Sequence, residues 1–411
     1  MFFVYEKLRK ESGNKITHPG KDLPTVMEDV FLQYPEESFY FLNEGRLKET
    51  AQIFQERFLP DDPRSRIAYA VKANPHPAVL RILTEAGINA FDCASIGEIE
   101  EIREVSPEAE IFFNNPKKKR KEIHQAVLNN VGHFTADLRT EVEKILSVCE
   151  GQISPEIAVR IKTLNPEGAM INLSEKFGAL FPEAQGLFHQ IGEAGATPGI
   201  SMNVGSQVLD MQSYRKNFIQ LLELIQSIKI RVSTVNIGGG IPVLQENSFA
   251  ENQILLQKYL QEMTQIFHNK IDQILLDSED AKIIIEPGRS MIAPSVDLGI
   301  SIISTHAEKG EDRLFIDDGV FTSFSESVIH DWTYYMKGID RKGKEILGEK
   351  REYVLEGRTC DSGDRIQSQL LVGGLTSDDY LHVPNAGAYL SSQAAIKFMG
   401  YRPHRYVLYN S

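Results

Sequence analysis

Cysteine is scarce in this sequence of 411 residues: only Cys93, Cys149 and Cys360 occur, far apart. They are too few and too scattered for a disulfide framework or a zinc site. Long apolar runs are also missing. None approaches the roughly 20 residues that a membrane-spanning helix needs, and the apolar start at Met1 turns charged too soon for a signal sequence. We therefore expect a cytoplasmic protein with no metal site and no membrane contact.

Positive charge is in deficit. The 44 Lys and Arg residues face 57 Asp and Glu residues, a net charge of −13. This balance argues against a nucleic-acid partner, because such proteins need clustered cations to replace the counterions of the phosphate backbone. The one basic run, residues 117–121, is interpreted as the solvated start of a helix. With 42% apolar residues the chain can bury a full core.

What the sequence does contain is alternation between short apolar or β-branched runs and longer stretches with helical spacing. Strand then helix, eight times in order, is typical of a closed (β/α)8 TIM barrel, with an open doubly wound sheet as the alternative. The eight predicted strands are Ile67–Val71, Ile88–Phe91, Glu110–Phe113, Gly132–Thr135, Glu156–Ile161, Gly199–Val204, Ser233–Ile237 and Lys282–Ile285.

The pattern changes after about residue 300, where predicted strands follow one another without long helices. The chain is therefore divided into three parts: an N-terminal segment 1–43 that lends a strand to a β domain, a barrel at 44–300, and a C-terminal β-rich domain at 301–411. Ser38–Leu42 is the N-terminal run expected to pair with strands such as Arg313–Ile316 and Tyr406–Leu408.

Polar and glycine residues stand where the predicted barrel strands end, which is where barrels of this type carry their active sites. Cations, carboxylates and bare glycines meeting in one mouth favour a charged, phosphorylated ligand, since exposed backbone N–H groups can close on a phosphate. These residues are Lys72, Asp92, Asn115, Asp137, Arg160, Asn203, Gly205, Ser206, Gly238, Gly239, Gly240, Glu286 and Arg289.

Lys72 is the most specific of these residues because it ends an apolar strand. We expect its amine to be partly desolvated and close to other cations, which lowers the pKa of a lysine and favours the neutral, imine-forming amine. The alternative is a lysine whose charged end merely reaches out from a strand end into solvent.

Taken together, the motifs resemble those of the alanine-racemase-fold decarboxylases, which include ornithine, lysine, arginine and diaminopimelate decarboxylases. The resemblance covers residues 38–400 and is closest to ornithine decarboxylase. It implies a barrel with a C-terminal β-rich, alanine-racemase-like domain and the cofactor pyridoxal 5′-phosphate (PLP). Its motifs, in chain order, are residues 70–74 (AVKAN), 91–95 (FDCAS), 204–206 (VGS), 238–240 (GGG), 286–289 (EPGR), 360–364 (CDSGD) and 387–389 (GAY).

The resemblance implies a role for each matching residue. Lys72 would bind PLP covalently, and Glu286 would face the ring nitrogen and keep it protonated, which favours decarboxylation over racemisation. Asp92, Arg160 and Asn203 would line the ring. The phosphate would be held by Gly205, Ser206, Gly238, Gly239, Gly240, Gly288, Arg289 and Tyr389.

The resemblance also implies a homodimer with shared active sites. Cys360 would reach the partner's site and protonate the carbon that loses carbon dioxide, and Lys176 would pair with Asp364 across the interface. Asp361 and Asp331 would bind the distal ammonium of a basic amino acid such as ornithine or lysine. The resemblance thus predicts a polyamine-forming carboxy-lyase.

One position departs from the family pattern. A histidine normally stacks on the PLP ring where this chain has Asn203, and asparagine is smaller and never cationic. The departure keeps two alternatives open: a decarboxylase of a larger conjugate, such as a carboxylated polyamine or a siderophore intermediate, and a catalytically silent PLP-binding regulator. Glu286 disfavours a third, a racemase.

Overall fold

The computed structural model describes residues 16–163, 169–171, 176–228, 231–274, 280–308, 310–395 and 398–411. The chain divides into two compact units. The first, here called the barrel unit, comprises Lys48–Val243 and Gln253–Met291. The second, the β unit, comprises the chain up to Leu47, the short stretch Leu244–Asn252, and Ile292–Ser411.

The barrel unit is built on eight strands that, among the described residues, form a closed barrel in the order β11-β12-β3-β4-β5-β6-β7-β9. All neighbours are parallel, and β12 closes the barrel on β3. The predicted TIM barrel is confirmed. Its strands are β3 (Ser65–Ala70), β4 (Ala90–Cys93), β5 (Glu110–Phe113), β6 (His133–Ala136), β7 (Glu156–Arg160), β9 (Thr197–Ser201), β11 (Thr234–Asn236) and β12 (Lys282–Ile285).

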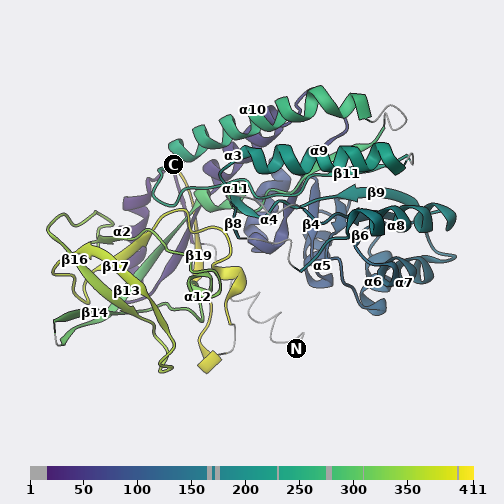
Figure 1. The fold of residues 1–411 in the computed structure, drawn as a ribbon. Helices are drawn as coiled ribbons and strands as arrows, with labels where there is room; N and C mark the ends of the chain where they lie inside the picture. Colours follow the sequence, from purple (N-terminus) through teal and green to yellow (C-terminus); the bar gives the residue numbers. More distant parts are fainter. Residues whose placement is uncertain are drawn as a thin grey trace. The chain divides into compact units, whose positions relative to one another are not determined.

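Helices alternate with these strands and lie outside them, as α5 to α8 show in Figure 1. Local sequence starts them: in α4, Pro77 occupies the first turn and His76 accepts a hydrogen bond from the Ala78 N–H at 3.3 Å. The helices are α3 (Glu44–Arg57), α4 (Pro77–Glu85), α5 (Ile96–Val105), α6 (Arg120–Leu128), α7 (Arg139–Cys149), α8 (Phe181–Glu193), α9 (Met211–Ile228), α10 (Phe249–Ile274) and the short α11 (Arg289–Ile292).

The barrel strands are apolar on both faces because helices cover the outside and side chains fill the inside. Ala68, Ala90, Phe112 and Ile284 form one buried cluster from four strands. A separate antiparallel pair, β8 (Ala169–Ile171) and β10 (Ser206–Val208), joins the connections that follow β7 and β9.

The β unit contains one mixed sheet, which has nine strands within the described residues. Strand β2 near the N-terminus lies between β13 and the C-terminal strand β19, so both ends of the chain build it. The strands are β1 (Ile16–Pro19), β2 (Phe39–Asn43), β13 (Val296–Glu308), β14 (Glu311–Ile316), β15 (Lys337–Ile339), β16 (Lys350–Glu356), β17 (Arg365–Val372), β18 (Tyr380–Val383) and β19 (Arg405–Asn410).

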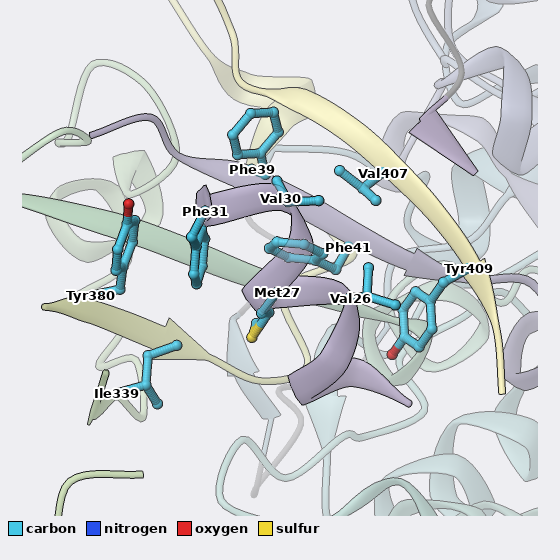
Figure 2. Close-up of a cluster of buried hydrophobic side chains, with 10 residues drawn as sticks. All are labelled: Val26, Met27, Val30, Phe31, Phe39, Phe41, Ile339, Tyr380, Val407 and Tyr409. Atoms are coloured by element: carbon cyan, nitrogen blue, oxygen red, sulfur yellow. The ribbon is translucent and has the colours of Figure 1, made fainter. Parts of the chain in front are cut away.

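Helix α2 (Leu23–Gln33) packs on this sheet, whereas α12 (Ser325–Ile329) is a short helix between β14 and β15. The buried face of α2 presents Val26, Met27, Val30 and Phe31 to side chains of β2, β15, β18 and β19 (Figure 2). The ring of Phe31 stacks on that of Tyr380 with centroids 3.8 Å apart. This cluster fixes the N-terminal segment to the β unit. Among the residues that the structure describes, no helix combines the length and apolarity needed to cross a membrane.

Candidate active site

A cavity of about 290 Å³ lies at the carboxyl ends of the barrel strands. It is predominantly polar, which is unusual for a space inside a barrel and requires an explanation beyond packing. Its lining residues are Lys72, Asp92, Ala94, Asn114, Asn115, Pro116, Thr135, Arg160, Lys176, Phe177, Ser201, Met202, Asn203 and Glu286. The fold thus brings together in one cavity five of the residues that the sequence predicted to bind the cofactor: Lys72, Asp92, Arg160, Asn203 and Glu286.

Lys72 reaches this cavity from a single 3-10 turn, Val71–Ala73, that follows β3. The turn is held because the Ala70 N–H donates to the Pro287 carbonyl at 3.0 Å and the Tyr69 hydroxyl donates to the Asn74 carbonyl at 3.1 Å. The Lys72 side chain is 46% exposed. About half of this side chain is therefore removed from solvent, so the predicted desolvation of Lys72 is only partial.

The sequence analysis expected Lys72 to lie close to other cations, but the structure pairs it with a carboxylate. Its Nζ donates to Oδ2 of Asp92 at 2.9 Å, and the Asp92 side chain is only 1% exposed. The other oxygen of Asp92, Oδ1, is buried without a hydrogen-bond partner in the described residues. A buried carboxylate oxygen without a partner is costly, which indicates that a ligand group completes this site.

Glu286 lines the same cavity and lies directly after β12, with its backbone N–H donating to the Gly238 carbonyl at 2.9 Å. Burial raises the pKa of this carboxyl, and the nearby charge of Asp92 raises it further. Lys72, the hydrogen bond from Asn236 and Arg160 act in the opposite direction. The protonation of Glu286 thus responds to any ligand that brings charge into the cavity.

Arg160 ends β7 and supplies the cavity's guanidinium. Burial lowers its pKa, while Glu286, Asp137 and Asp92 raise it, so the group remains charged as arginine does in proteins. Its Cζ lies 5.5 Å from the ring centre of Phe177, and Lys176 Nζ lies 5.2 Å from the same ring. Both distances are within the range of cation–π attraction.

The three glycines after β11 have no room for a side chain. A Cβ on Gly238 would lie 2.6 Å from the Met202 carbonyl oxygen, and one on Gly239 would lie 2.3 Å from that of Glu286. A Cβ on Gly240 would lie 2.6 Å from the carbonyl oxygen of Gly205. The two glycine loops predicted to bind phosphate therefore abut one another, as a cradle of backbone groups requires.

The remaining predicted phosphate residues of the barrel unit are close in sequence to these loops. Ser206 begins β10, and Gly288 precedes Arg289, which is buried and begins α11. Asn203 folds back on its own loop, because its Oδ1 accepts a hydrogen bond from the Gly205 N–H at 3.0 Å. Its amide is therefore part of the loop that the sequence assigned to phosphate binding.

Four predicted residues belong to the β unit. Cys360 is exposed, with its sulfur 3.5 Å from that of Met399, and Asp361 is exposed on the same loop. Asp331 is exposed after α12, with a φ of 54°. Tyr389 also has a left-handed backbone, with a φ of 64°, a conformation uncommon for residues other than glycine.

Asp364 holds the Cys360 loop in place. It is 2% exposed. Its Oδ1 accepts from the Val320 N–H at 2.8 Å, and its Oδ2 accepts from the Thr359 N–H at 3.0 Å and the Thr359 hydroxyl at 2.6 Å. The pairing of Asp364 with Lys176 of a second subunit remains a prediction.

Sequence reasoning did not identify Asn114, Asn236, Thr135 and Phe177. It did place Asn115 and Asp137 among the site residues, and the structure gives both of them mainly structural contacts. Asn115 lines the cavity but serves the backbone, donating to the Ala94 carbonyl at 3.2 Å and accepting from Lys117 N–H at 3.1 Å. Asp137 pairs with Lys117 and accepts from the Gly178 N–H at 2.9 Å. Asn236 could have been found from the sequence, because it is a polar residue two positions before the glycine triplet. Alternate residues of a strand share a face, so Asn236 lies on the same face as the first glycine.

A parallel barrel whose mouth combines a lysine, a buried carboxylate and abutting glycine loops is the kind of site that binds a phosphorylated cofactor through an amine. The comparisons define the class further. Residues 44–293 match the family model described as pyridoxal-dependent decarboxylase, pyridoxal binding domain. The chain belongs to this family of PLP-dependent decarboxylases, which confirms the resemblance and the predicted cofactor.

Among curated relatives, a lysine/ornithine decarboxylase of Selenomonas ruminantium is 29% identical over 95% of this chain and 91% of that protein. Ornithine decarboxylase of Mus musculus is 26% identical over 85% of this chain and 77% of that protein. A crystal structure of lysine decarboxylase from Selenomonas ruminantium superposes with a TM-score of 0.79 at 25% identity, covering 94% of this chain and 96% of that one. A variant called SrLDC, solved in complex with PLP, gives a TM-score of 0.80 at 25% identity, covering 94% and 95%.

Proposed function

We propose that this protein removes the α-carboxyl group of a basic amino acid, ornithine or lysine, and releases carbon dioxide and the corresponding amine. The observation that carries the proposal is that Lys72 and Glu286 line one cavity beside two abutting glycine loops. The names of the relatives at 29% and 26% identity support the choice of substrate. The names of these relatives disfavour a larger conjugate as substrate. A silent regulator is disfavoured because the cavity retains the amine and the carboxylate that decarboxylation needs.

The residues present fit PLP. Lys72 would bind its aldehyde carbon, and the backbone of Gly205 and Gly238–Gly240 would hold its phosphate, together with Ser206, Gly288, Arg289 and Tyr389. The partnerless oxygen of Asp92 and the guanidinium of Arg160 would supply polar contacts along the ring. Asn203 would contact one face of the ring.

PLP, when bound, supplies a conjugated ring that accepts the electron pair left on the substrate's α-carbon as carbon dioxide departs. Glu286 serves this chemistry by keeping a proton on the ring nitrogen. Asp92 accepts a hydrogen bond from Lys72 Nζ and would hold this lysine in the cavity when it is free and protonated, which is before the cofactor binds and again after the substrate amine has replaced the lysine on the cofactor. Arg160 remains a cation and balances the negative charge that the cofactor and the carboxylates bring together.

The β unit contributes the remaining groups, and we assign them to a site shared between two subunits of a homodimer. Cys360, exposed on its loop, donates a proton to the carbon that lost the carboxyl group. Asp361 and Asp331 bind the distal ammonium of the substrate. The fixed loop geometry around Asp364 keeps Cys360 and Asp361 in place. A cytoplasmic location also remains a prediction.

The substrate assignment is tested by measuring carbon dioxide release from ornithine, lysine, arginine, diaminopimelate and a carboxylated polyamine with the purified, PLP-loaded protein. We expect turnover of ornithine or lysine and weak turnover of the others. Asp361→Ala and Asp331→Ala should raise KM for the diamino acids. Preference for the carboxylated polyamine would replace the substrate class. PLP binding without release of carbon dioxide from any substrate would favour the silent regulator.

The shared site is tested by mixing Lys72→Ala with Cys360→Ala and measuring formation of the normal amine product, because Cys360 acts after carbon dioxide has left and Cys360→Ala alone should still release carbon dioxide. In a homodimer with shared sites, each mixed dimer regains one intact site, so an equal mixture recovers about a quarter of wild-type activity by random pairing. The recovery should be absent when each variant is assayed alone. No recovery after subunit exchange has been verified by mass would rule out sharing between subunits.

A further inference from the structure

Glu286 receives two hydrogen bonds on the same oxygen. Oε1 accepts from Asn114 Nδ2 at 2.6 Å and from Asn236 Nδ2 at 2.6 Å. Asn114 follows β5, whereas Asn236 ends β11, so the two donors come from opposite directions along the barrel wall. Neither residue was singled out by its sequence motif.

The orientation of each amide is fixed by a separate contact. The carbonyl oxygen of Asn114 accepts from the Thr135 hydroxyl at 2.7 Å, and that of Asn236 accepts from the Gly238 N–H at 2.9 Å. An amide that turned over would place its own oxygen against the Glu286 carboxylate, and a turned Asn236 would also lose its bond from the Gly238 N–H, which can only donate. The NH2 groups therefore face Glu286.

Because both amides bind Oε1, they leave the second oxygen uncommitted. Within the described residues Oε2 takes part in no hydrogen bond, and Glu286 lines the cavity. A carboxyl group held at one oxygen by two anchored donors has little freedom to rotate about its last bond. The amides of Asn114 and Asn236, here called the mount, thus orient the carboxyl group so that Oε2 of Glu286 faces the cavity.

The same pair also favours the charged form of Glu286. Of the charged and titratable groups around it, Asp92 on β4 opposes ionisation, as does burial, while Lys72 after β3 and Arg160 on β7 favour it. Tyr214 on α9 is buried, and its own pKa is raised, in part by Glu286. Amide donors stabilise a carboxylate more than a protonated carboxyl, because hydrogen bonds to an ionised acceptor are stronger.

We propose that Asn114 and Asn236 are positioning residues that keep Glu286 ionised and aim its Oε2 at the ring nitrogen of the cofactor. The inference rests on the proposed function, in which Glu286 faces that nitrogen. Thr135 acts indirectly in the same arrangement, because its hydroxyl donates to Asn114 and so sets the orientation of that amide. Asn236 has a second task, since its carbonyl oxygen holds the first glycine of the phosphate loop.

Asn114→Ala is the direct test because it removes one donor and leaves the glycine loop untouched. The measurement is the 15N chemical shift of PLP labelled at the ring nitrogen and bound to the protein, followed across pH. Without this donor, Glu286 competes better for the proton it shares with the ring. We expect the ratio of ring-protonated to ring-neutral cofactor to fall about tenfold or more, with kcat reduced in step.

Thr135→Val and Thr135→Ser separate orientation from mere packing. Valine keeps the shape but cannot donate to Asn114, whereas serine keeps the hydroxyl. The shift seen in Asn114→Ala should appear, smaller, in Thr135→Val and should be restored in Thr135→Ser. Asn115→Ala is the matched control, because it removes a neighbouring amide of the same cavity that, within the described part of the chain, is hydrogen-bonded to backbone groups and not to Glu286. Its ring-nitrogen titration should match the wild type.

If the wild-type protein binds no PLP, the proposed function is refuted, and the role proposed for the mount is refuted with it. The mount itself is refuted if Asn114→Ala binds PLP and titrates at the ring nitrogen as the wild type does. If Asn114→Ala fails to fold, as judged by near-ultraviolet circular dichroism, Thr135→Val decides. An unchanged 15N titration in that folded variant overturns the proposal.

Discussion

The two ends of the barrel use charge in opposite ways. At the amino ends of the strands, Glu110 binds Lys282, His133 Nε2 at 3.4 Å and Arg66 Nε at 3.3 Å, so one carboxylate has three basic partners. At the carboxyl ends, Glu286 binds two neutral amides. The amino ends thus neutralise Glu110 by direct ion pairs, whereas at the carboxyl ends Lys72 pairs with Asp92 but Glu286 has, within the described residues, amide partners alone and no ion pair.

The pKa values show the same contrast. Burial raises the pKa of Glu110, but the bonds from His133 and Lys282 outweigh it and lower the value to about 2. Burial lowers the pKa of His133, but Glu110 and Glu156 raise it to about 9. At the other end, burial and Asp92 raise the pKa of Glu286. We infer that the amino ends contribute stability and the carboxyl ends contribute function, which is the usual division in TIM-barrel enzymes.

The most stringent test of this difference between the two ends is to replace one lysine at each end. Lys72→Ala should lower kcat by about a thousandfold or more, because the covalent hold on the cofactor is lost. The protein should also lose the visible absorbance of lysine-bound PLP. The assay is carbon dioxide release under single-turnover conditions, with the absorbance spectrum recorded in parallel.

Lys282→Met is the matched lysine at the other end, where it removes a partner of Glu110. It should keep the colour and the activity but lose about 1–3 kcal/mol of unfolding free energy in urea, the usual cost of breaking a partly buried ion pair. The division between the ends fails if Lys282→Met loses activity while its folded fraction is unchanged.

The next largest effect is expected in the glycine loop. In Gly239→Ala the new methyl group would lie 2.3 Å from the Glu286 carbonyl oxygen, so the loop or the glutamate must move. A displacement near 1 Å in a site of this kind costs about a hundredfold in kcat/KM. PLP affinity, measured by titrating the apoprotein, should fall with it. Gly186→Ala is the control: this glycine lies in α8, and a Cβ added there would have no atom of another element within 4 Å, so the variant should gain about 0.5–1 kcal/mol of stability without loss of activity.

The eight barrel strands, Lys72, the glycine triplet and Glu286 could be predicted because each depends on local sequence. Strand periodicity marks where a strand ends, and the fold places those ends in one mouth. The choice between Asn114 and Asn115 could not be predicted in this way. Both amides line the cavity, and a shift of one residue at the end of β5 decides which of them reaches Glu286, whereas single sequences place strand ends within only a few residues.

The ion-pair network at the amino ends was invisible for a different reason. Glu110, His133, Glu156 and Lys282 each begin a strand, and a charged residue at a strand start normally meets solvent. Their contact follows only from strand order, which places β5, β6 and β7 side by side and β12 across the barrel. Sequence separation of up to 172 residues hides such a pair.

The amino-end network should make stability depend on pH. His133 has a folded pKa of about 9, above its ordinary value of 6.5, so its contribution is full below pH 6.5 and is lost as the pH rises toward 9. We expect a loss of about 2 kcal/mol over this window, since the side chain is 24% exposed. Urea unfolding of the wild type and His133→Gln at pH 6 and pH 9.5 measures it. The gap between the two proteins should shrink by about that amount at the higher pH, and an equal gap at both would contradict the assigned charge.

The smallest expected effect concerns the cavity itself, where Arg160 lies against an aromatic ring and, among the residues that the structure describes, has no direct acid partner. Phe177 lies 5.5 Å from its Cζ, and the adjoining Gly178 N–H is held by Asp137 at 2.9 Å, which fixes the ring's position. Phe177→Leu should therefore weaken PLP binding about three- to tenfold, the scale of one cation–π contact, with little change in kcat. Phe177→Tyr keeps the ring and should bind PLP as the wild type does. Equal affinities for all three proteins would mean that Arg160 is held by the cavity's carboxylates alone, and the carboxyl end would then resemble the amino end more closely than we propose.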